Sequence, residues 1–527
     1  MTTRPGPAGL GRRQISGSGP AGPAGTGAGT VAARRPPARP WLAAGPPLLT
    51  LSLALWGITA PSYWRDETAT LAATGRPFGR MIAMLGHVDA VHGAYYVLMW
   101  PVVRLGGTGE LTTRLPSVLA MVAATAGVVA IGQRLAGRAA GLVAGLVFAV
   151  LPEVSWFAQD ARSYAIVTAL AVAASYLLLR VLDSGGQRRW LLAYAAGLVV
   201  LGLFNIFSLL LVPAHAVTVA LTARRRRGEP GWAKRPGGRG PLLARWAAAA
   251  GAATVLVSPL IVAGWTQRQQ ISWIRPAGLR GALTVRLLIG PEPLTITTLL
   301  ITTCAVAGAA AGPGRLRAWW PPRLLSLALP WALLPATVLV AVSLVHPVWL
   351  FRYVLFCIPA VALLVGATVA SLGRPAGATA LAVIVLLGLP MQVTSRQELG
   401  HGDGIRGADR VIAALRQPGD GVYWAQDGMR TAAAAYPYGL AQLRDVALGR
   451  TAAADERLFG RNVTGPRLRQ QLRSAPRLWV LEIHQDDPVP LLGQLGFRRT
   501  GTWPEGDLLL SLYARRPAGP PGPGSAP

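Results

Sequence analysis

This chain of 527 residues is apolar and basic: 52% of its residues are hydrophobic, 14% are charged, and its formal net charge is +29. Its mean hydropathy of +0.40 excludes it from the ordinary soluble globular proteins. The arginines stand between apolar runs and do not line one face, which argues against a nucleic-acid-binding protein. Cys304 and Cys357 both fall inside apolar runs, so neither a disulfide framework nor a thiolate metal site is expected.

The first part of the chain predicts a tail and then a membrane domain. Residues 1–40 are rich in Gly, Pro and Ala, which is typical of a disordered tail. The apolar run at 41–60 is longer than a signal-peptide core and is followed by further runs, which favours an uncleaved first helix. Because such runs recur as far as residue 394, we predict an all-α polytopic membrane domain over 41–394, with about 11 transmembrane helices.

The stretch 87–105 decides the predicted topology. Counted as a full span, it would place the arginines of 224–227 outside the cell, against the positive-inside rule. It is also short and rich in aromatic residues, as helices that lie in the membrane interface tend to be. We therefore predict that 61–114 is one long external segment with interfacial helices, and that the N-terminus is cytoplasmic. The later spans are then expected at 115–132, 139–155, 163–181, 190–204, 206–222, 246–264, 294–311, 324–345, 353–372 and 376–394.

After residue 394 the chain changes character. Residues 395–516 are predicted to form a small extracytoplasmic α/β domain, and 517–527 a disordered tail rich in Pro and Gly. Alternating and periodic patterns predict strands at 421–424 and 477–483, and helices near 405–416 and 466–473.

Two adjacent carboxylates, Asp66 and Glu67, stand where the chain leaves the first predicted span. Acidic residues are scarce in this chain (22, against 51 Lys and Arg), and a carboxylate at an apolar boundary is costly to desolvate. Such residues often mark a functional site. The predicted topology brings further polar residues to the same outer boundary: His87, Asp89, His92, Asp160, Arg162, Tyr164, His346, Arg352 and Tyr353.

Each of these residues also has a purely structural interpretation. Asp66 could pair with Arg65, and Asp160 with Arg162, as surface ion pairs of little energetic value. The histidines of the external segment are too loosely spaced for a metal signature, and His215 on an apolar helix fits a hydrogen-bonded core residue. The functional interpretation depends on the convergence of acids, arginines and histidines on one side of the membrane.

Such a set of side chains suits the displacement of a phosphate leaving group at a membrane surface. A carboxylate can deprotonate an acceptor hydroxyl, and an arginine, a histidine or a metal can stabilise the departing phosphate. A sugar carried on a lipid phosphate would bring its anomeric carbon to this depth.

The order of motifs resembles the polytopic GT-C glycosyltransferases. Within them it is similar to the family 39-like group, which includes protein O-mannosyltransferases and aminoarabinose transferases, and most of all to actinobacterial mannosyltransferase-like membrane proteins. The resemblance covers about 41–394 well and the tail loosely. The motifs that carry it are Trp64-Arg65-Asp66-Glu67, Asp89 through Tyr96, Arg114-Leu115-Pro116-Ser117, Gln159 through Tyr164, and His346 through Tyr353.

The resemblance implies roles for individual residues. Asp66 would be the catalytic base, with Glu67 supporting it or helping to hold a metal. Asp160 would also belong to the catalytic group. The implied substrate-binding residues are Arg65, His92, Tyr96, Arg162, Tyr164, His346, Arg352 and Tyr353. Relatives often carry Pro where this chain has Gly93, and the aminoarabinose transferases use a lysine near the phosphate that this chain lacks there.

The sequence thus predicts a membrane hexosyltransferase that moves a sugar, expected to be mannose, from a polyprenyl-phosphate donor to an acceptor hydroxyl with inversion. The implied partners are the lipid-linked donor, an acceptor protein or glycan, and the bilayer, but not nucleic acid. No cofactor is assigned, and the resemblance allows a divalent cation. A transporter or lipid-linked-sugar flippase is the main alternative, although the predicted spans carry almost no charge. A catalytically inactive scaffold whose outer domain binds a partner is a third hypothesis.

Overall fold

The computed structural model describes residues 40–226, 239–274, 320–483 and 489–515. These residues form a helical membrane domain, followed by a smaller domain built on a β-sheet. The predicted span 294–311 and the predicted tails at 1–40 and 517–527 lie outside the described residues, apart from Pro40.

Within the described ranges, seven helices are long and apolar enough to cross a membrane, and a bent pair makes an eighth candidate. This confirms the predicted multi-pass membrane protein. The pair consists of α6 (Arg138–Val150) and α7 (Pro152–Ala158), which meet at an angle of 62°. Leu151 is extended before Pro152, a residue that disfavours helical backbone in its predecessor. The seven candidate spans are Glu110–Ala136 (α5), Tyr164–Asp183 (α8), Ile206–Arg225, Leu242–Thr266, Pro322–Ser343 (α16), Phe351–Ser371 and Arg374–Thr394 (α18).

Some predicted spans correspond to shorter or composite elements. The run at 41–60 contains α1 (Gly45–Leu55), and the run at 190–204 is α9 (Arg188–Phe204). Three candidate spans are formed largely by α10 (Leu211–Arg226), α11 (Arg239–Thr266) and α17 (Ile358–Ser371).

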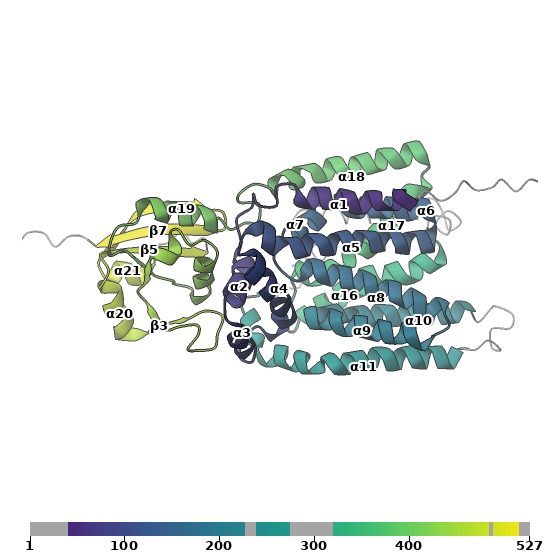
Figure 1. The fold of residues 1–527 in the computed structure, drawn as a ribbon, viewed down its shortest axis with the longest axis horizontal. Helices are drawn as coiled ribbons and strands as arrows, with labels where there is room; N and C mark the ends of the chain where they lie inside the picture. The colour runs from purple at the N-terminus through teal and green to yellow at the C-terminus, as the bar shows by residue number, and fades with distance from the viewer. Residues whose placement is uncertain (1–39, 227–238, 275–319, 484–488, 516–527) are drawn as a thin grey trace, which may run out of the picture. The chain divides into compact units, whose positions relative to one another are not determined.

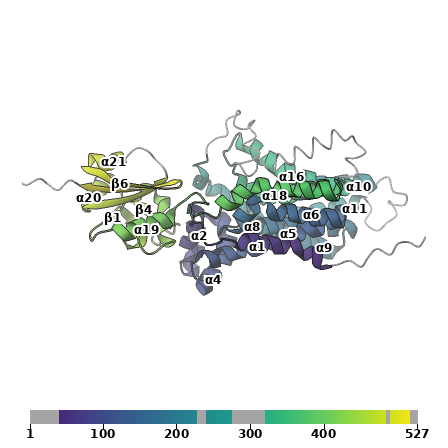
Figure 2. The same cartoon turned by 90° about the horizontal axis from the view of Figure 1, so that it is seen from above.

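The helices of the bundle approach one another closely where small residues meet. A Cβ atom at Gly366 of α17 would lie 2.3 Å from the backbone of Ala144 in α6. A Cβ atom at Gly132 of α5 would lie 2.7 Å from Gly141, also in α6. Small side chains therefore let α5, α6 and α17 pack backbone against backbone, as in other membrane bundles. Both views show α1, α5 and α6 side by side (Figures 1 and 2).

Three short helices lie across one end of the bundle, between α1 and α5 in sequence (Figure 1). They are α2 (Arg65–Thr74), α3 (Phe78–Leu85) and α4 (Gly93–Gly106). None of the three helices is long and apolar enough to count as a membrane span. The segment at 87–105, which contains most of α4, is therefore not a candidate span. The side of the membrane on which they lie stays a prediction.

The C-terminal domain contains a five-stranded mixed sheet with the strand order β2-β1-β5-β7-β6. Strands and helices appear where the sequence predicts them, and this confirms the predicted fold class. The domain boundary at residue 395 stays a prediction. The elements are α19 (Ile405–Leu415), β1 (Gly421–Val422), β2 (Arg444–Asp445), β3 (Leu448–Arg450), β4 (Arg461–Asn462), α20 (Gly465–Arg473), β5 (Arg477–Ile483), α21 (Pro490–Gln494), β6 (Phe497–Glu505) and β7 (Leu508–Arg515).

Candidate active site

The two adjacent acidic residues lie near the start of helix α2. Asp66 and Glu67 occupy its first turn, where the unpaired N–H groups and the helix dipole favour negative charge. The two side chains nevertheless lie in different surroundings.

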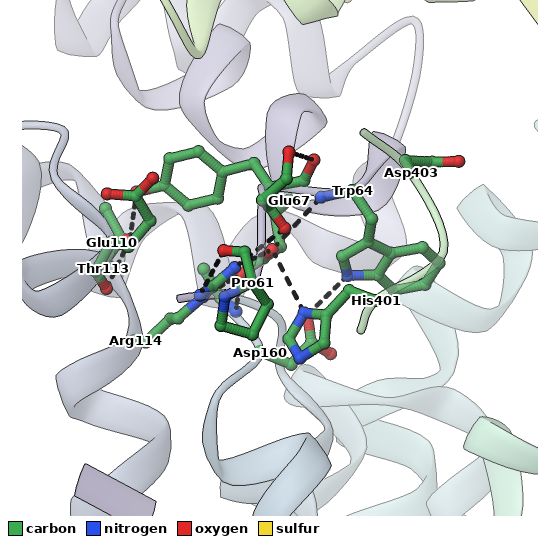
Figure 3. A network of polar contacts seen from close by, with 12 residues as sticks. Pro61, Trp64, Glu67, Glu110, Thr113, Arg114, Asp160, His401 and Asp403 are labelled. Atoms are coloured by element: carbon green, nitrogen blue, oxygen red, sulfur yellow. Dashed lines mark hydrogen bonds and ion pairs between the residues drawn. The ribbon is translucent and has the colours of Figure 1, made fainter. Parts of the chain in front are cut away.

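Glu67 is fully buried and its carboxylate is saturated with donors. Arg114 donates two hydrogen bonds to it, Nε to Oε1 at 2.9 Å and Nη2 to Oε2 at 2.8 Å (Figure 3). The Ala161 amide also donates to Oε1, at 2.8 Å. His401 approaches from the C-terminal part of the chain, with its Nδ1 3.8 Å from Oε2. Burial alone would raise the pKa of Glu67, but Arg114 outweighs it and lowers the pKa to about 2.

Arg114, on α5, extends this network beyond the ion pair. Its guanidinium also donates to the carbonyl oxygens of Ile58 at 2.7 Å, Pro61 at 3.1 Å and Ser62 at 3.3 Å. The buried pair therefore fixes the chain segment that leads into α2. Glu67 acts here as a structural anchor, and its oxygens are occupied by protein donors.

Asp66 points toward a different partner. Its side chain is 23% exposed, and its Oδ2 lies 3.4 Å from Nη2 of Arg352. The guanidinium of Arg352 stands over the indole rings of Trp64 and Trp273, at 5.5 and 5.7 Å from the ring centroids. In the described part of the chain, Nε of Arg352 has no hydrogen-bond partner although it is buried. This pair combines an accessible carboxylate with a guanidinium that retains an unused donor.

Asp160 lies next to the same tryptophan. Its Oδ1 accepts a hydrogen bond from Nε1 of Trp64 at 3.0 Å, and the side chain is completely buried. Its Oδ2 has no partner among the described residues. Burial, reinforced by the negative charge of Glu67, raises the pKa of Asp160 well above its usual range. A protonated Asp160 would present a hydrogen-bond donor to this site.

Asp89, His92, Tyr96 and Arg162 form a connected chain of hydrogen bonds. Asp89 accepts from the Tyr96 hydroxyl at 2.5 Å and faces His92 Nδ1 at 3.1 Å. Nη2 of Arg162 lies 2.7 Å from Nε2 of His92, so His92 is held as the tautomer that donates from Nδ1 and accepts at Nε2. Arg162 also reaches the backbone oxygen of Asp66 at 3.4 Å, which joins this cluster to the first turn of α2.

Among the remaining predicted residues, Arg65 and His346 contact other partners, whereas Tyr164 and Tyr353 lie near enough to Asp66 and Arg352 to interact electrostatically. Arg65 donates to Asp403 and is turned toward the C-terminal part of the chain. His346 is exposed and packs edge-on against Trp265, with 5.8 Å between the ring centroids. Tyr353 stacks on Phe207, also part of the bundle. Tyr164 is buried against Phe157. Their predicted substrate-binding roles stay predictions.

The site also contains residues to which the sequence assigned no role. Asp89 and Arg114 stood inside the recognised motifs, so their positions were visible in the sequence. His401 and Asp403 carried no signal, because they lie more than 300 residues from their partners in α2. Among the described residues, no group of three or more His, Cys, Asp or Glu side chains is arranged to hold a metal ion.

Residues 94–233 match the model of a family described as dolichyl-phosphate-mannose-protein mannosyltransferase. The fold is similar to that of ArnT from Cupriavidus metallidurans in the apo state, with a TM-score of 0.54 and 14% sequence identity over 88% of this chain and 96% of ArnT. The structure of the same protein bound to undecaprenyl phosphate gives a TM-score of 0.53 and 14% identity over 88% and 97% of the two chains. None of the curated proteins matches this sequence. The family match and the shared fold confirm the resemblance to the GT-C glycosyltransferases.

Proposed function

We propose that this protein is a membrane glycosyltransferase that moves a hexose, mannose, from a polyprenyl-phosphate donor to an acceptor hydroxyl. The observation that carries the proposal is the pair of Asp66 and Arg352, a partly exposed carboxylate beside a guanidinium with an unused donor. This pair brings a base and a phosphate ligand to one place, at the end of a membrane bundle.

The proposed reaction is a single displacement. The carboxylate of Asp66 takes the proton of the acceptor hydroxyl, and the acceptor oxygen forms a bond to the anomeric carbon. The bond between that carbon and the phosphate oxygen breaks, and the lipid phosphate leaves with the bonding electrons. Attack opposite to the leaving group inverts the anomeric configuration.

Arginine supplies the charge stabilisation in this scheme. Arg352 faces Asp66 directly, and Arg162 lies one hydrogen bond from the backbone of the same residue. Both guanidinium groups have a buried Nε without a hydrogen-bond partner in the described ranges. These donors are available for phosphate oxygens, on which negative charge increases as the bond to the sugar breaks.

The other residues of the site have supporting roles. Asp160 offers its Oδ2, which has no partner among the described residues, to the sugar or the acceptor. His92 and Tyr96 orient Arg162 through the contacts that they make with it. Glu67 fixes the first turn of α2 and does not take part in proton transfer.

The comparisons support the class of donor. The matching family is described by a lipid-phosphate sugar, dolichyl-phosphate-mannose, and the structurally similar ArnT was solved with undecaprenyl phosphate bound. The arginine clusters between spans support a cell-membrane orientation with a cytoplasmic N-terminus and the sheet domain on the outside.

The direct test supplies the protein, in membrane vesicles, with radiolabelled polyprenyl-phosphate mannose and a cell-envelope acceptor fraction, and identifies the labelled product. The wild type is expected to transfer the label, whereas Asp66→Asn is not. Glu398→Gln is a matched control, because Glu398 is an exposed acid that pairs with Arg410 on the C-terminal side. Undiminished transfer by Asp66→Asn at normal protein level would contradict the base assignment. Uptake of sugar without a covalent product would favour a transporter.

A further inference from the structure

The segment that follows the last membrane helix is tied to the segment that leads into α2. Nε of Arg396 donates to the carbonyl oxygen of Trp56 at 2.8 Å. The Ser62 amide donates to the carbonyl oxygen of Glu398 at 2.8 Å. Nη1 of Arg406 donates to the carbonyl oxygen of Ala60 at 2.9 Å. Two stretches more than 300 residues apart in sequence are thus joined along their length.

Asp403 makes the contact nearest to the proposed base. Its Oδ2 accepts from the backbone N–H of Arg65 at 2.8 Å and from Nε of Arg65 at 3.0 Å, and its Oδ1 accepts from Nη2 at 2.9 Å. The side chain of Asp403 is 1% exposed, against 32% for Arg65. A buried carboxylate therefore receives three hydrogen bonds from the residue that precedes Asp66.

This contact satisfies a backbone amide at the start of α2, beside the bond that Glu67 accepts from the Trp64 amide at 3.4 Å. Arg65 is the first residue of α2, and its N–H is one of the amides that have no partner within the helix. The N-cap position is occupied by Trp64, whose side chain makes no capping hydrogen bond to the helix. An N-cap side chain bonds the N–H of the second or third helical residue, so the N–H of Arg65, the first, needs a partner from elsewhere in the chain. Here the carboxylate comes from Asp403, and it also places negative charge at the positive end of the helix dipole.

Asp403 is in turn held by the turn between β6 and β7. The Gly404 amide donates to the carbonyl oxygen of Glu505 at 2.9 Å, and the Asp507 amide donates to that of Gly402 at 2.8 Å. An isolated β-bridge pairs Asp403 with Gly506. The position of the cap is therefore set by the sheet of the C-terminal domain.

We infer that Asp403 is a positioning residue for Asp66, so that the C-terminal domain holds the proposed base in place. Its effect on turnover rests on the proposed function, whereas its effect on α2 does not. Glu67 is anchored from the membrane side by Arg114, and Asp403 anchors the same turn from the other side. A reacting group displaced by about 1 Å can lose about 100-fold in rate, so a frayed first turn would slow transfer.

The experiment compares Asp403→Ala and Asp403→Asn with Asp507→Asn. Asp507 is the matched control, because its carboxylate also faces Arg65, at 3.6 Å, but is 68% exposed and makes no capping contact. Asp403→Ala is expected to lower kcat, per folded molecule, by about 10- to 100-fold with little change in the KM for the lipid donor. Asp403→Asn retains one acceptor oxygen and should recover part of the loss. If Asp403→Ala fails to fold, the same measurements are made on Asp403→Asn.

Hydrogen exchange tests the capping of α2 by Asp403 separately from the positioning of Asp66. The amides of residues 65–68 are expected to exchange faster in Asp403→Ala than in the wild type or in Asp507→Asn, whatever the activity. Unchanged exchange would overturn the capping, and faster exchange with kcat within twofold of the wild type would overturn the positioning of Asp66. If the wild type itself transfers no sugar, the proposed function fails, while the exchange result still decides whether Asp403 caps α2.

Discussion

Asp66 and Glu67 are neighbours in sequence and lie in the same helical turn, yet their surroundings are opposite. Glu67 is buried and shares both oxygens with Arg114, Ala161 and Trp64. Asp66 is partly exposed, and its oxygen is 3.4 Å from a guanidinium that also stands over two indole rings. The comparison indicates that Glu67 fixes the turn, while Asp66 remains accessible to a substrate.

The largest expected effect concerns the accessible acid. Asp66→Asn should reduce transfer by about 10²- to 10⁴-fold, the usual contribution of a general base. Its effect on the free energy of unfolding should be below about 1 kcal/mol, because partly exposed ion pairs contribute little. Turnover and denaturant unfolding, measured on one purified sample, check both parts. A destabilised but fully active variant would reverse the roles assigned to the two acids.

The buried acid should behave in the opposite way. Glu67→Gln leaves Arg114 buried without its counter-charge, which should cost about 3–5 kcal/mol of unfolding free energy. We expect a lower yield of folded protein from membranes and a lower unfolding midpoint, while the surviving folded molecules keep most of their turnover. Glu398→Gln, at an exposed pair, is the control. A stable but inactive Glu67→Gln protein would show that Glu67 takes part in the chemistry.

The same pair predicts a dependence of stability on pH. Because the folded-state pKa of Glu67 is lowered from 4.5 to about 2, the unfolded state binds its proton first as the pH falls. The stabilisation by Glu67 is therefore complete above about pH 4.5 and is lost as the pH falls toward 2. Unfolding measured across this window should show a steeper loss of stability in the wild type than in Glu67→Gln. Equal slopes would contradict the pairing.

Arg352 offers a sharper test of the accessible pair. Arg352→Ala removes the guanidinium that faces Asp66, and transfer should fall by about 100-fold, the effect of losing one donor to a developing charge. Arg352→Lys keeps the charge but loses the planar fork, so it should recover only part of the loss. Arg410→Ala, at an exposed position, should retain wild-type turnover. Full activity of Arg352→Ala would place the phosphate elsewhere.

The sequence predicted the apolar helices well, because their composition and length follow from the bilayer alone. The predicted topology also brought four charged residues to one membrane boundary, namely Asp66, Asp160, Arg162 and Arg352. The structure places them around Trp64 and the start of α2.

What the sequence could not predict is how partners are distributed among neighbours. Nothing in the order Arg65-Asp66-Glu67 indicates that Arg65 turns to Asp403, or that Glu67 binds Arg114 47 residues later. Those contacts depend on how α2 is packed between α5 and the C-terminal domain. Spacing along one helix carries no information about such packing.

The smallest effect is expected in the cluster behind Arg162. Asp89 accepts from Tyr96 and His92, and its backbone has a positive φ of 63°, a conformation that Asn also tolerates. Asp89→Asn should therefore fold, but its amide can no longer serve both donors, and Arg162 loses its fixed neighbour. The loss of one charged hydrogen bond predicts about a tenfold lower kcat/KM, with the change mainly in the KM for the lipid donor. Donor titrations on Asp89→Asn and Asp507→Asn measure this. A loss confined to kcat would assign the cluster to the chemical step and not to binding of the lipid phosphate.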